Sequence, residues 1–379
     1  MTNTLSFPGL GITIELNRVA FSIGDFPIYW YGITFALAFL VGVAYFYRHS
    51  RQVGIHPDDG FDILLCAVVG GVIGARAYYV IFQWDAMYKD DPMKIFAFRE
   101  GGLAIYGGVI GAILVGALVS WLKKVPLIPM LDVCLPALLM GQGIGRWGNF
   151  FNIEAFGSNT TLPWGMTSPV IEEYLSRPSV VEELAKLGQT VDPTLPVHPT
   201  FFYEFVWNTL GFLLLAYVLT PRRKYDGQVA LGYMAWYGLG RFFIEQLRTD
   251  SLVTETPWGV IRVSQWLGMA LFLLSAVLLI VFHFRAGKED SPSWLRLYVN
   301  TEESALAMAK ADRAAKGIKD VPENTPEQTA EDEPGENGEQ DSSVKDETDI
   351  SEEEKQISQQ EGEENAEEVS QSTQEEPKE

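Results

Sequence analysis

Seven long apolar segments constrain this 379-residue chain more than any other feature. Each has about 20 residues with few charges, which is enough for a helix to cross about 30 Å of hydrocarbon. A buried soluble core would explain one or two such segments, but not seven. We therefore predict an all-α polytopic membrane protein. The segments are residues 28–47, 61–84, 103–122, 125–145, 201–219, 228–247 and 263–284.

Basic residues between these segments predict the orientation. They follow the first, third, fifth and seventh segments in short loops, whereas the other loops balance basic residues with acidic ones. Because short cytoplasmic loops are enriched in Lys and Arg, we expect the N-terminus outside and the C-terminus in the cytoplasm. The basic residues are Arg48, Arg51, Lys123, Lys124, Arg222, Arg223, Lys224, Arg285 and Lys288.

The segments also predict the domain organisation. We expect a short external N-terminal segment (1–27) and a seven-span membrane domain (28–285), in which a long external loop (146–200) forms an ordered lobe. An interfacial helix is expected over 286–310. A disordered cytoplasmic tail is expected over 311–379, because its Glu, Gln, Ser and Pro residues cannot form a core. Residues from 287 onward carry −19 of the formal net charge of −21, so the acidity belongs to the tail.

Polar and charged residues within the spans gather at one side of the predicted membrane. With the topology above, almost all of them fall near the outer face, and Asp132 is an exception near the inner face. Charged groups are costly in a bilayer and usually mark a functional site, so we predict one polar cavity open to the outer side. Its residues are Tyr31, Arg76, Tyr106, Arg146, Asn149, His198, Tyr203, Glu204, Tyr237, Arg241, Glu245, Arg248 and Gln265.

The sixth segment carries a regular polar pattern. Tyr237, Arg241 and Glu245 are four residues apart, which places them on one helix face. An internal Arg241–Glu245 ion pair that only locks packing would explain this pattern. However, four arginines are expected at similar depth, and a guanidinium binds phosphate through two parallel hydrogen bonds. The cavity is therefore predicted to bind a phosphate group at the level of the lipid headgroups.

Five motifs resemble one known family. They are "WYG" (30–32), "GAR" (74–76), "GRWGNFFNIEAFG" (145–157), "HPTFFYE" (198–204) and "YGLGRFFIEQLR" (237–248). In sequence, order and spacing, residues 27–285 resemble bacterial prolipoprotein diacylglyceryl transferases. The resemblance implies a seven-span enzyme of the bacterial inner (plasma) membrane, with its N-terminus outside. Such an enzyme moves the diacylglyceryl group of phosphatidylglycerol to the lipobox cysteine of a prolipoprotein. This first step of lipoprotein maturation forms a thioether and releases glycerol phosphate.

The resemblance also implicates individual residues. It leads to the hypothesis that Arg146 and Arg241 hold the phosphate, while Glu154, Glu245 or His198 accepts the thiol proton. Arg76, His198 and Arg248 are further candidates for substrate binding because they belong to the predicted cavity. Gly148 and Gly157 are expected to let the backbone turn out of the helix. The residues implied by the resemblance are Tyr31, Arg146, Asn149, Glu154, Gly157, Tyr237, Arg241 and Glu245.

One position departs from the family pattern. Many members have histidine where this chain has Tyr106, and that histidine is a candidate base in the family. A tyrosine titrates near pH 10 and is a poor base at neutral pH. Tyr106 can still donate a hydrogen bond to a headgroup, so we keep it among the candidate site residues.

Two other classes of function stay open at this stage. A flippase or transporter of an anionic phospholipid or phosphorylated solute would also need arginines, although the polar residues stay on one side and no inverted repeat is evident. A non-catalytic scaffold or receptor would use the external lobe for its partner. The sequence has no nucleotide motif and no metal-ligand spacing, so we expect no cofactor, no metal and no nucleic-acid partner.

Overall fold

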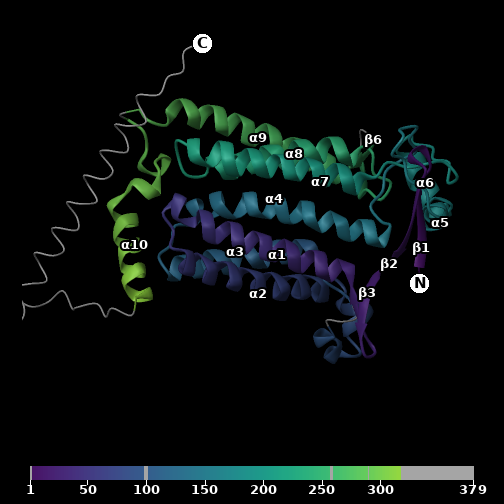
Figure 1. The fold of residues 1–379 in the computed structure, drawn as a ribbon, viewed down its shortest axis with the longest axis horizontal. Helices are drawn as coiled ribbons and strands as arrows, with labels where there is room; N and C mark the ends of the chain where they lie inside the picture. Colours follow the sequence, from purple (N-terminus) through teal and green to yellow (C-terminus); the bar gives the residue numbers. More distant parts are fainter. Residues whose placement is uncertain (1, 98–100, 257–258, 289, 317–379) are drawn as a thin grey trace, which may run out of the picture. The chain divides into compact units, whose positions relative to one another are not determined.

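Seven helices run back and forth through one bundle (Figure 1). The computed structural model describes residues 2–97, 101–256, 259–288 and 290–316. Every predicted span coincides with a helix, and α7 continues through a π-helical turn (Leu214–Leu219) and a 3-10 turn (Thr220–Arg222). The seven helices are α1 (Trp30–His49), α2 (Pro57–Phe82), α3 (Ile105–Leu122), α4 (Leu127–Asn152), α7 (Thr200–Leu213), α8 (Gln228–Glu245) and α9 (Val263–Arg285).

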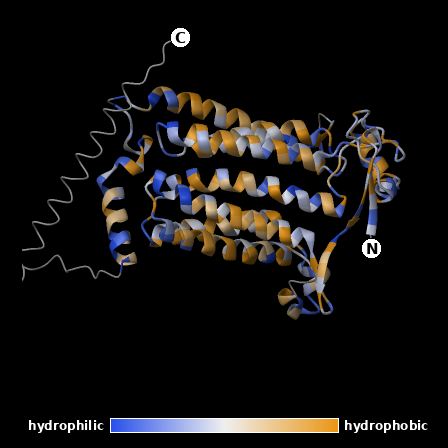
Figure 2. Ribbon diagram, in the orientation of Figure 1, coloured by the Kyte–Doolittle hydropathy of each residue, from blue (hydrophilic) through white to orange (hydrophobic). Residues whose placement is uncertain are grey.

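Apolar surface dominates the bundle. Within the described residues, six helical segments are long and apolar enough to cross a membrane. They correspond to every predicted span except α8, which is an 18-residue helix packed against α4, α7 and α9. Hydrophobic residues follow the helices along their length in Figure 2. The prediction of a mostly helical membrane protein is therefore confirmed.

The two ends of the bundle differ. We call the end where α2, α4 and α8 finish the lobe end, and the end where these helices begin the basic end, since the basic loops lie there. The side-by-side packing of α2 with α3 and of α8 with α9 relies on glycine. A Cβ atom on Gly74 would lie 2.4 Å from the Gly107 oxygen, and one on Gly238 would lie 2.4 Å from the Gly268 oxygen. Small residues at these positions allow the backbones to approach closely.

An ordered lobe follows α4, as predicted, but it also includes the N-terminal segment. The strands β1 (Thr2–Phe7) and β2 (Ile12–Asn17) form an antiparallel hairpin, and α5 (Pro169–Leu175) and α6 (Pro178–Lys186) complete the lobe. Leu5 is only 1% exposed, so the hairpin helps to form the core of the lobe. Other members of this core are Leu16, Ile153, Phe156, Met166, Ile171, Leu175, Val180, Leu184, Val197 and Phe201.

Three short hairpins make the prediction of an all-α fold incomplete. Besides β1–β2, the described residues contain β3 (Val19–Ile23) with β4 (Phe26–Tyr29), and β5 (Val253–Thr256) with β6 (Gly259–Arg262). Each strand has four to six residues, too few for a clear alternating pattern in the sequence. The β3–β4 and β5–β6 hairpins directly precede α1 and α9, whereas β1–β2 belongs to the lobe, so none of them interrupts the helical bundle.

The segment after α9 folds back on the basic end. The helix α10 (Glu302–Ala315) is fixed by an Arg51–Asp312 ion pair of 2.7 Å and by a hydrogen bond of 3.2 Å from the Ser304 hydroxyl to the Gly54 carbonyl. A helix thus follows the last span, but it begins and ends later than the interfacial helix predicted over residues 286–310, and it includes residues 311–315 of the predicted tail. Its position at a membrane interface stays a prediction. Residues 317–379, where most of the predicted tail falls, lie outside the described residues.

Candidate active site

Three arginines from different segments meet at one carboxylate at the lobe end. Glu204, in the second turn of α7, forms an ion pair with Arg146 of α4 through its Oε2 atom. Its Oε1 atom lies 3.2 Å from Nη1 of Arg248 and 3.8 Å from Nη1 of Arg241 in α8. Glu204 is 7% exposed, so these charges meet in a largely enclosed position. We call Glu204 and these three arginines the arginine cluster.

The sixth span contributes the predicted polar face. Arg241 Nη2 lies 2.7 Å from Oε2 of Glu245, whose side chain is 1% exposed. One turn before Arg241, the Tyr237 ring stacks on Tyr233 with centroids 5.8 Å apart and planes 8° from parallel. The Arg241–Glu245 pair therefore exists, and Arg241 extends it to Glu204 on another helix.

A chain of hydrogen bonds connects the arginine cluster to the turn after α4. Arg146 donates to Oδ1 of Asn149 (3.4 Å), and Asn149 donates to Oε1 of Glu154 (2.9 Å). Asn152 donates to the same Glu154 oxygen (3.2 Å). The Glu154 carboxylate is thereby held one side chain away from Arg146.

The turn that carries Glu154 contains two non-glycine residues with left-handed backbone. Ile153 and Ala155 have φ angles of 53° and 55°. A β-branched residue rarely adopts this conformation, and such strain persists only where the surrounding structure imposes it. The expectation that Gly148 and Gly157 make this turn is wrong, because α4 continues through Asn152 and the left-handed residues follow it.

The two glycines instead allow close approach. A Cβ atom on Gly148 would lie 2.4 Å from the Tyr31 ring, which packs against α4 at this point. One on Gly157 would lie 2.8 Å from Cβ of His198 and 2.9 Å from the Leu247 carbonyl. Gly157 also donates its N–H to the His198 carbonyl (2.9 Å), so it joins the segments that lead into α7 and out of α8.

His198 has a defined polar partner outside the arginine cluster. Its Nδ1 lies 3.1 Å from the hydroxyl of Tyr203, which accepts a hydrogen bond from the Trp164 indole (2.8 Å). Burial lowers the pKa of His198 below its usual value, which favours the neutral ring. If the Tyr203 hydroxyl donates to Nδ1, the ring proton of neutral His198 is on Nε2.

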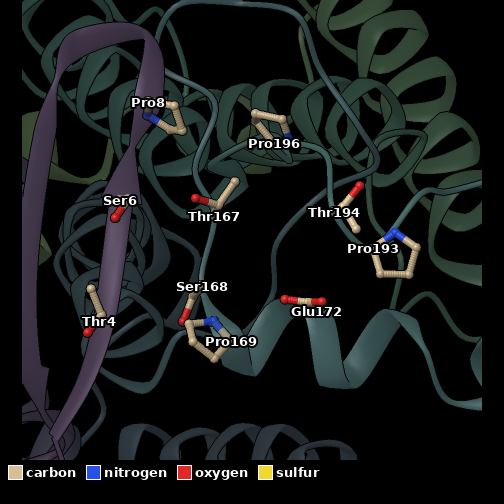
Figure 3. A pocket seen from close by; sticks show the side chains of 10 residues that line it. All are labelled: Thr4, Ser6, Pro8, Thr167, Ser168, Pro169, Glu172, Pro193, Thr194 and Pro196. Atoms are coloured by element: carbon tan, nitrogen blue, oxygen red, sulfur yellow. The ribbon is translucent and has the colours of Figure 1, made fainter.

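Two cavities lie in the lobe. The larger, of about 560 Å³, lies between β1, the start of α5 and residues 193–196 (Figure 3). The smaller, of about 220 Å³, is lined by the turn at residues 152–156 and by Arg18, Arg177 and Asp250, among others. Glu154 belongs to the lining of the smaller cavity, so a residue that Asn149 links to Arg146 borders an open space.

About two thirds of the sequence matches one known family. A family model described as prolipoprotein diacylglyceryl transferase matches residues 18–281. The chain belongs to this family.

Similar proteins agree with this assignment. A phosphatidylglycerol–prolipoprotein diacylglyceryl transferase of Lactiplantibacillus plantarum is 42% identical over 70% of this chain and 89% of its own length. A protein of the same name from Finegoldia magna is 39% identical over 73% of this chain and 99% of its own length. A third, from Bacillus cytotoxicus, is 38% identical over 72% of this chain and 94% of its own length. This chain is thus a membrane transferase of the prolipoprotein diacylglyceryl transferase family.

The hydrogen bonds of Arg76 differ from those of the other predicted arginines of this transferase. Its guanidinium donates to the backbone carbonyls of Ile95 (2.9 Å), Gly101 (2.6 Å) and Lys94 (2.6 Å), and also to those of Ala97 and Gly102. Arg76 thereby orders the connection between α2 and α3. Three of the four arginines meet at Glu204, and the prediction that all four share one cavity stays a prediction.

Two tyrosines of the predicted site lie at exposed helix starts. Tyr106, the second residue of α3, is 55% exposed, and Tyr31 in the first turn of α1 is 48% exposed. Within the described part of the chain, the Tyr106 hydroxyl has no hydrogen-bond partner. The structure therefore gives Tyr106 no contact with the arginine cluster.

Glu204 belongs to the predicted cavity, but its central position among the arginines does not follow from the sequence. It was counted among the polar residues of the fifth span and lies in the "HPTFFYE" motif, but no role was assigned to it. Three predicted arginines at the same depth would have indicated a shared acidic partner, because buried charges are normally paired. Within the described residues, no group of His, Cys, Asp and Glu could hold a metal ion.

Proposed function

We propose that this transferase moves the diacylglyceryl group of phosphatidylglycerol to the lipobox cysteine thiol of a prolipoprotein, at the outer face of the bacterial plasma membrane. The observation that carries the proposal is the meeting of Arg146, Arg241 and Arg248 at one end of an apolar bundle. That end is the outer end in the orientation expected from the basic loops. The names of the three similar proteins supply the two substrates.

The arginine cluster suits the phosphate of the lipid. In the structure, the Glu204 carboxylate lies between guanidinium groups that come from α4, α8 and the segment after α8. A phosphate offers oxygens of the same kind with similar geometry. The phosphate would therefore share or take over guanidinium hydrogen bonds while Glu204 keeps the arginines together. Enclosure strengthens these interactions because it excludes water.

The reaction needs a thiolate and a stabilised leaving group. The sulfur attacks the carbon of the diacylglyceryl group that is bonded to the phosphate oxygen. A C–S bond forms, and the bond between that carbon and the phosphate oxygen breaks. The electron pair of that bond leaves with the phosphate as glycerol phosphate, where Arg146 and Arg241 stabilise the developing charge. A free thiol has a pKa of about 8.5 and is already roughly 3% thiolate at pH 7. Nearby guanidinium groups raise that fraction.

Glu154 is our preferred acceptor of the thiol proton. It receives hydrogen bonds from two amides, and within the described residues it has no cationic partner. It also lines the smaller cavity, through which a proton can reach water. Glu245, in contrast, is fully buried and paired with Arg241. Burial lowers the pKa of His198, which makes its ring a weaker proton acceptor.

The remaining predicted residues would bind or position the lipid. Tyr31 packs against Gly148 in the same turn of α4 as Arg146, and Tyr237 lies one turn before Arg241 in α8. Arg248 supplies the third guanidinium. Gly157 and His198 would shape the wall between the arginine cluster and the lobe. We assign Arg76 an indirect role, because its donors already serve the α2–α3 connection.

Labelled phosphatidylglycerol and a lipobox peptide test the proposal. Arg146→Ala and Arg241→Ala are each expected to lower thioether formation by about 100-fold or more, the loss typical of removing one charge-stabilising donor. Arg222→Ala is the matched control, since Arg222 is exposed at the basic end rather than the lobe end, and donates to the Val218 carbonyl (3.1 Å). Near-full activity in both cluster variants would overturn the mechanism. Lipid movement without thioether product would instead indicate a flippase.

A further inference from the structure

The outer edge of β1 is only partly occupied. Along its other edge, β1 pairs with β2 over its whole length. On the outer edge, Ser6 exchanges two backbone hydrogen bonds with Thr167 (2.9 and 2.8 Å). Because backbone groups alternate in direction along a strand, the N–H and C=O of Thr4 point to the same side as those of Ser6. No described residue provides a partner for them, so this edge has free hydrogen-bonding groups.

This edge forms one wall of the larger cavity. The floor and the opposite wall come from residues 167–169, Glu172 and residues 193–196 (Figure 3). The lining combines hydroxyl groups with proline rings, and Glu172 is its one charged residue. Figure 3 shows Thr4 and Ser6 on one side of the open space and Thr194 on the other. We call this space the lobe groove.

A series of backbone pairings connects the lobe groove to the arginine cluster. Thr167, the partner of Ser6, follows Met166, which pairs with Val197 through two hydrogen bonds of 3.0 and 2.9 Å. The next residue is His198, whose carbonyl accepts the Gly157 N–H. Gly157 in turn pairs with Arg248. The groove and the third arginine therefore belong to one hydrogen-bonded framework.

We propose that the lobe groove binds the extended chain of the prolipoprotein beyond its acceptor cysteine, by adding it as a strand to β1. This inference rests on the proposed function. With the cysteine at the arginine cluster, the rest of the acceptor continues from the lobe end, where the groove lies. An unfolded exported chain has unpaired backbone groups, and a free strand edge can form hydrogen bonds with them whatever the side chains are.

The chemistry of the groove fits such an acceptor. Main-chain hydrogen bonds are independent of side chains, so different acceptors can bind in the same way. The neutral hydroxyls and proline rings offer contacts to small polar and apolar side chains, and they impose no strong charge requirement. The groove would thereby lower the KM for acceptors with a long chain after the cysteine, while the chemical step would be unchanged.

A proline substitution tests the edge directly. Thr4→Pro removes one N–H that faces the groove, and the β1–β2 hydrogen bonds of Asn3, Leu5 and Phe7 remain. Glu15→Pro is the matched control. Glu15 is directly opposite Thr4 in the hairpin, and its N–H points away from β1. Thr194→Trp fills the groove from an exposed loop and provides a second variant that leaves β1 unchanged.

The variants are compared with two acceptor peptides. One ends directly after the cysteine, and the other continues for about ten residues, or roughly 33 Å when extended. In the wild type, the long acceptor should have the lower KM. Thr4→Pro and Thr194→Trp should raise that KM about five- to tenfold, as expected for lost backbone hydrogen bonds. The KM of the short acceptor, the KM of phosphatidylglycerol and the kcat should not change, and Glu15→Pro should match the wild type.

Other outcomes would overturn the inference. Equal KM values for both acceptors in the wild type would do so, as would an unchanged KM in both groove variants. If the wild type forms no thioether with either peptide, the proposed function fails. Photo-crosslinking of the long peptide to position 194 then still decides on the groove. A crosslink that is lost in Thr4→Pro would support binding in the lobe groove. The absence of a crosslink in the wild type, or an equal crosslink in Thr4→Pro, would refute it.

Discussion

Arginines at two places in this molecule differ in the partners that lie closest to them. Arg146, Arg241 and Arg248 of the arginine cluster are bound to carboxylates. Arg223, at the basic end, donates to the backbone carbonyls of Gln52 (2.6 Å) and Thr220 (2.9 Å), and its one carboxylate contact in the described structure, Asp226, lies farther away at 3.9 Å. Carbonyl partners hold two segments of chain together and cannot be replaced without moving the backbone. Carboxylate partners can give way to another anion.

The acidic residues show the same contrast. Asp132 in α4 accepts the N–H groups of Gly227 and Ala230, each at 2.8 Å, and so caps the beginning of α8. Glu204 accepts only from side chains in the described structure. The type of partner, backbone or side chain, thus distinguishes a charge that stabilises the fold from one that belongs to a binding site. Burial alone does not, since both carboxylates are buried.

The largest effect is expected for Glu204→Gln. This change keeps the shape of the side chain but leaves three guanidinium groups without their shared charge, so they should move apart. Displacement of binding groups by about 1 Å can lower a rate about 100-fold. We expect a loss of that order in kcat/KM for phosphatidylglycerol, measured with the labelled-lipid assay. Wild-type activity would show that the arginines keep their positions without Glu204.

A stability effect without a comparable catalytic effect is expected for Asp132→Asn. The amide can accept fewer of the N–H groups at the start of α8, and hydrogen bonds to a charged group contribute about 1.5–3 kcal/mol each. Thermal unfolding in detergent should show a loss of about 2 kcal/mol. Transfer per folded molecule should stay within about twofold, because distant sites act independently. A rate loss as large as that expected for Glu204→Gln would contradict the distinction between a carboxylate bound to the backbone and one bound to side chains.

The smallest effect is expected for Tyr106→Phe. The Tyr106 side chain is 55% exposed, and surface substitutions usually change free energies by about 0.5 kcal/mol or less. The kcat/KM should therefore remain within about twofold of the wild type. A large loss would show that the hydroxyl contacts the lipid headgroup or the thiol during the reaction. It would thereby extend the active site beyond the arginine cluster.

The sequence was sufficient to predict the helices and the meeting of the arginines. The length of each apolar segment defines a span. The positions of Arg146, Arg241 and Arg248 near the ends of their spans then give their depth in the membrane. Depth does not determine direction around the helix axis, and this explains why Arg76 was grouped with them. Its partners are carbonyls in a connection whose path has no periodic pattern to predict it.

Tertiary contacts also explain the other differences. The segment 1–27 is predicted only as a short external segment, because a hairpin of six-residue strands has too weak a pattern to indicate a core. The left-handed residues Ile153 and Ala155 could not be predicted either, because glycine is the usual residue at such positions. Both features depend on packing between segments that are distant in sequence.

The contacts of α10 have a practical consequence for the length of the folded enzyme. Asp312 pairs with Arg51 after the first span, and Ser304 bonds to Gly54. The last span ends at Arg285, so a truncation or fusion placed just after it would remove a brace from the loop between α1 and α2. Shortened forms of this protein should therefore keep residues 286–316, and a label or purification tag belongs beyond them.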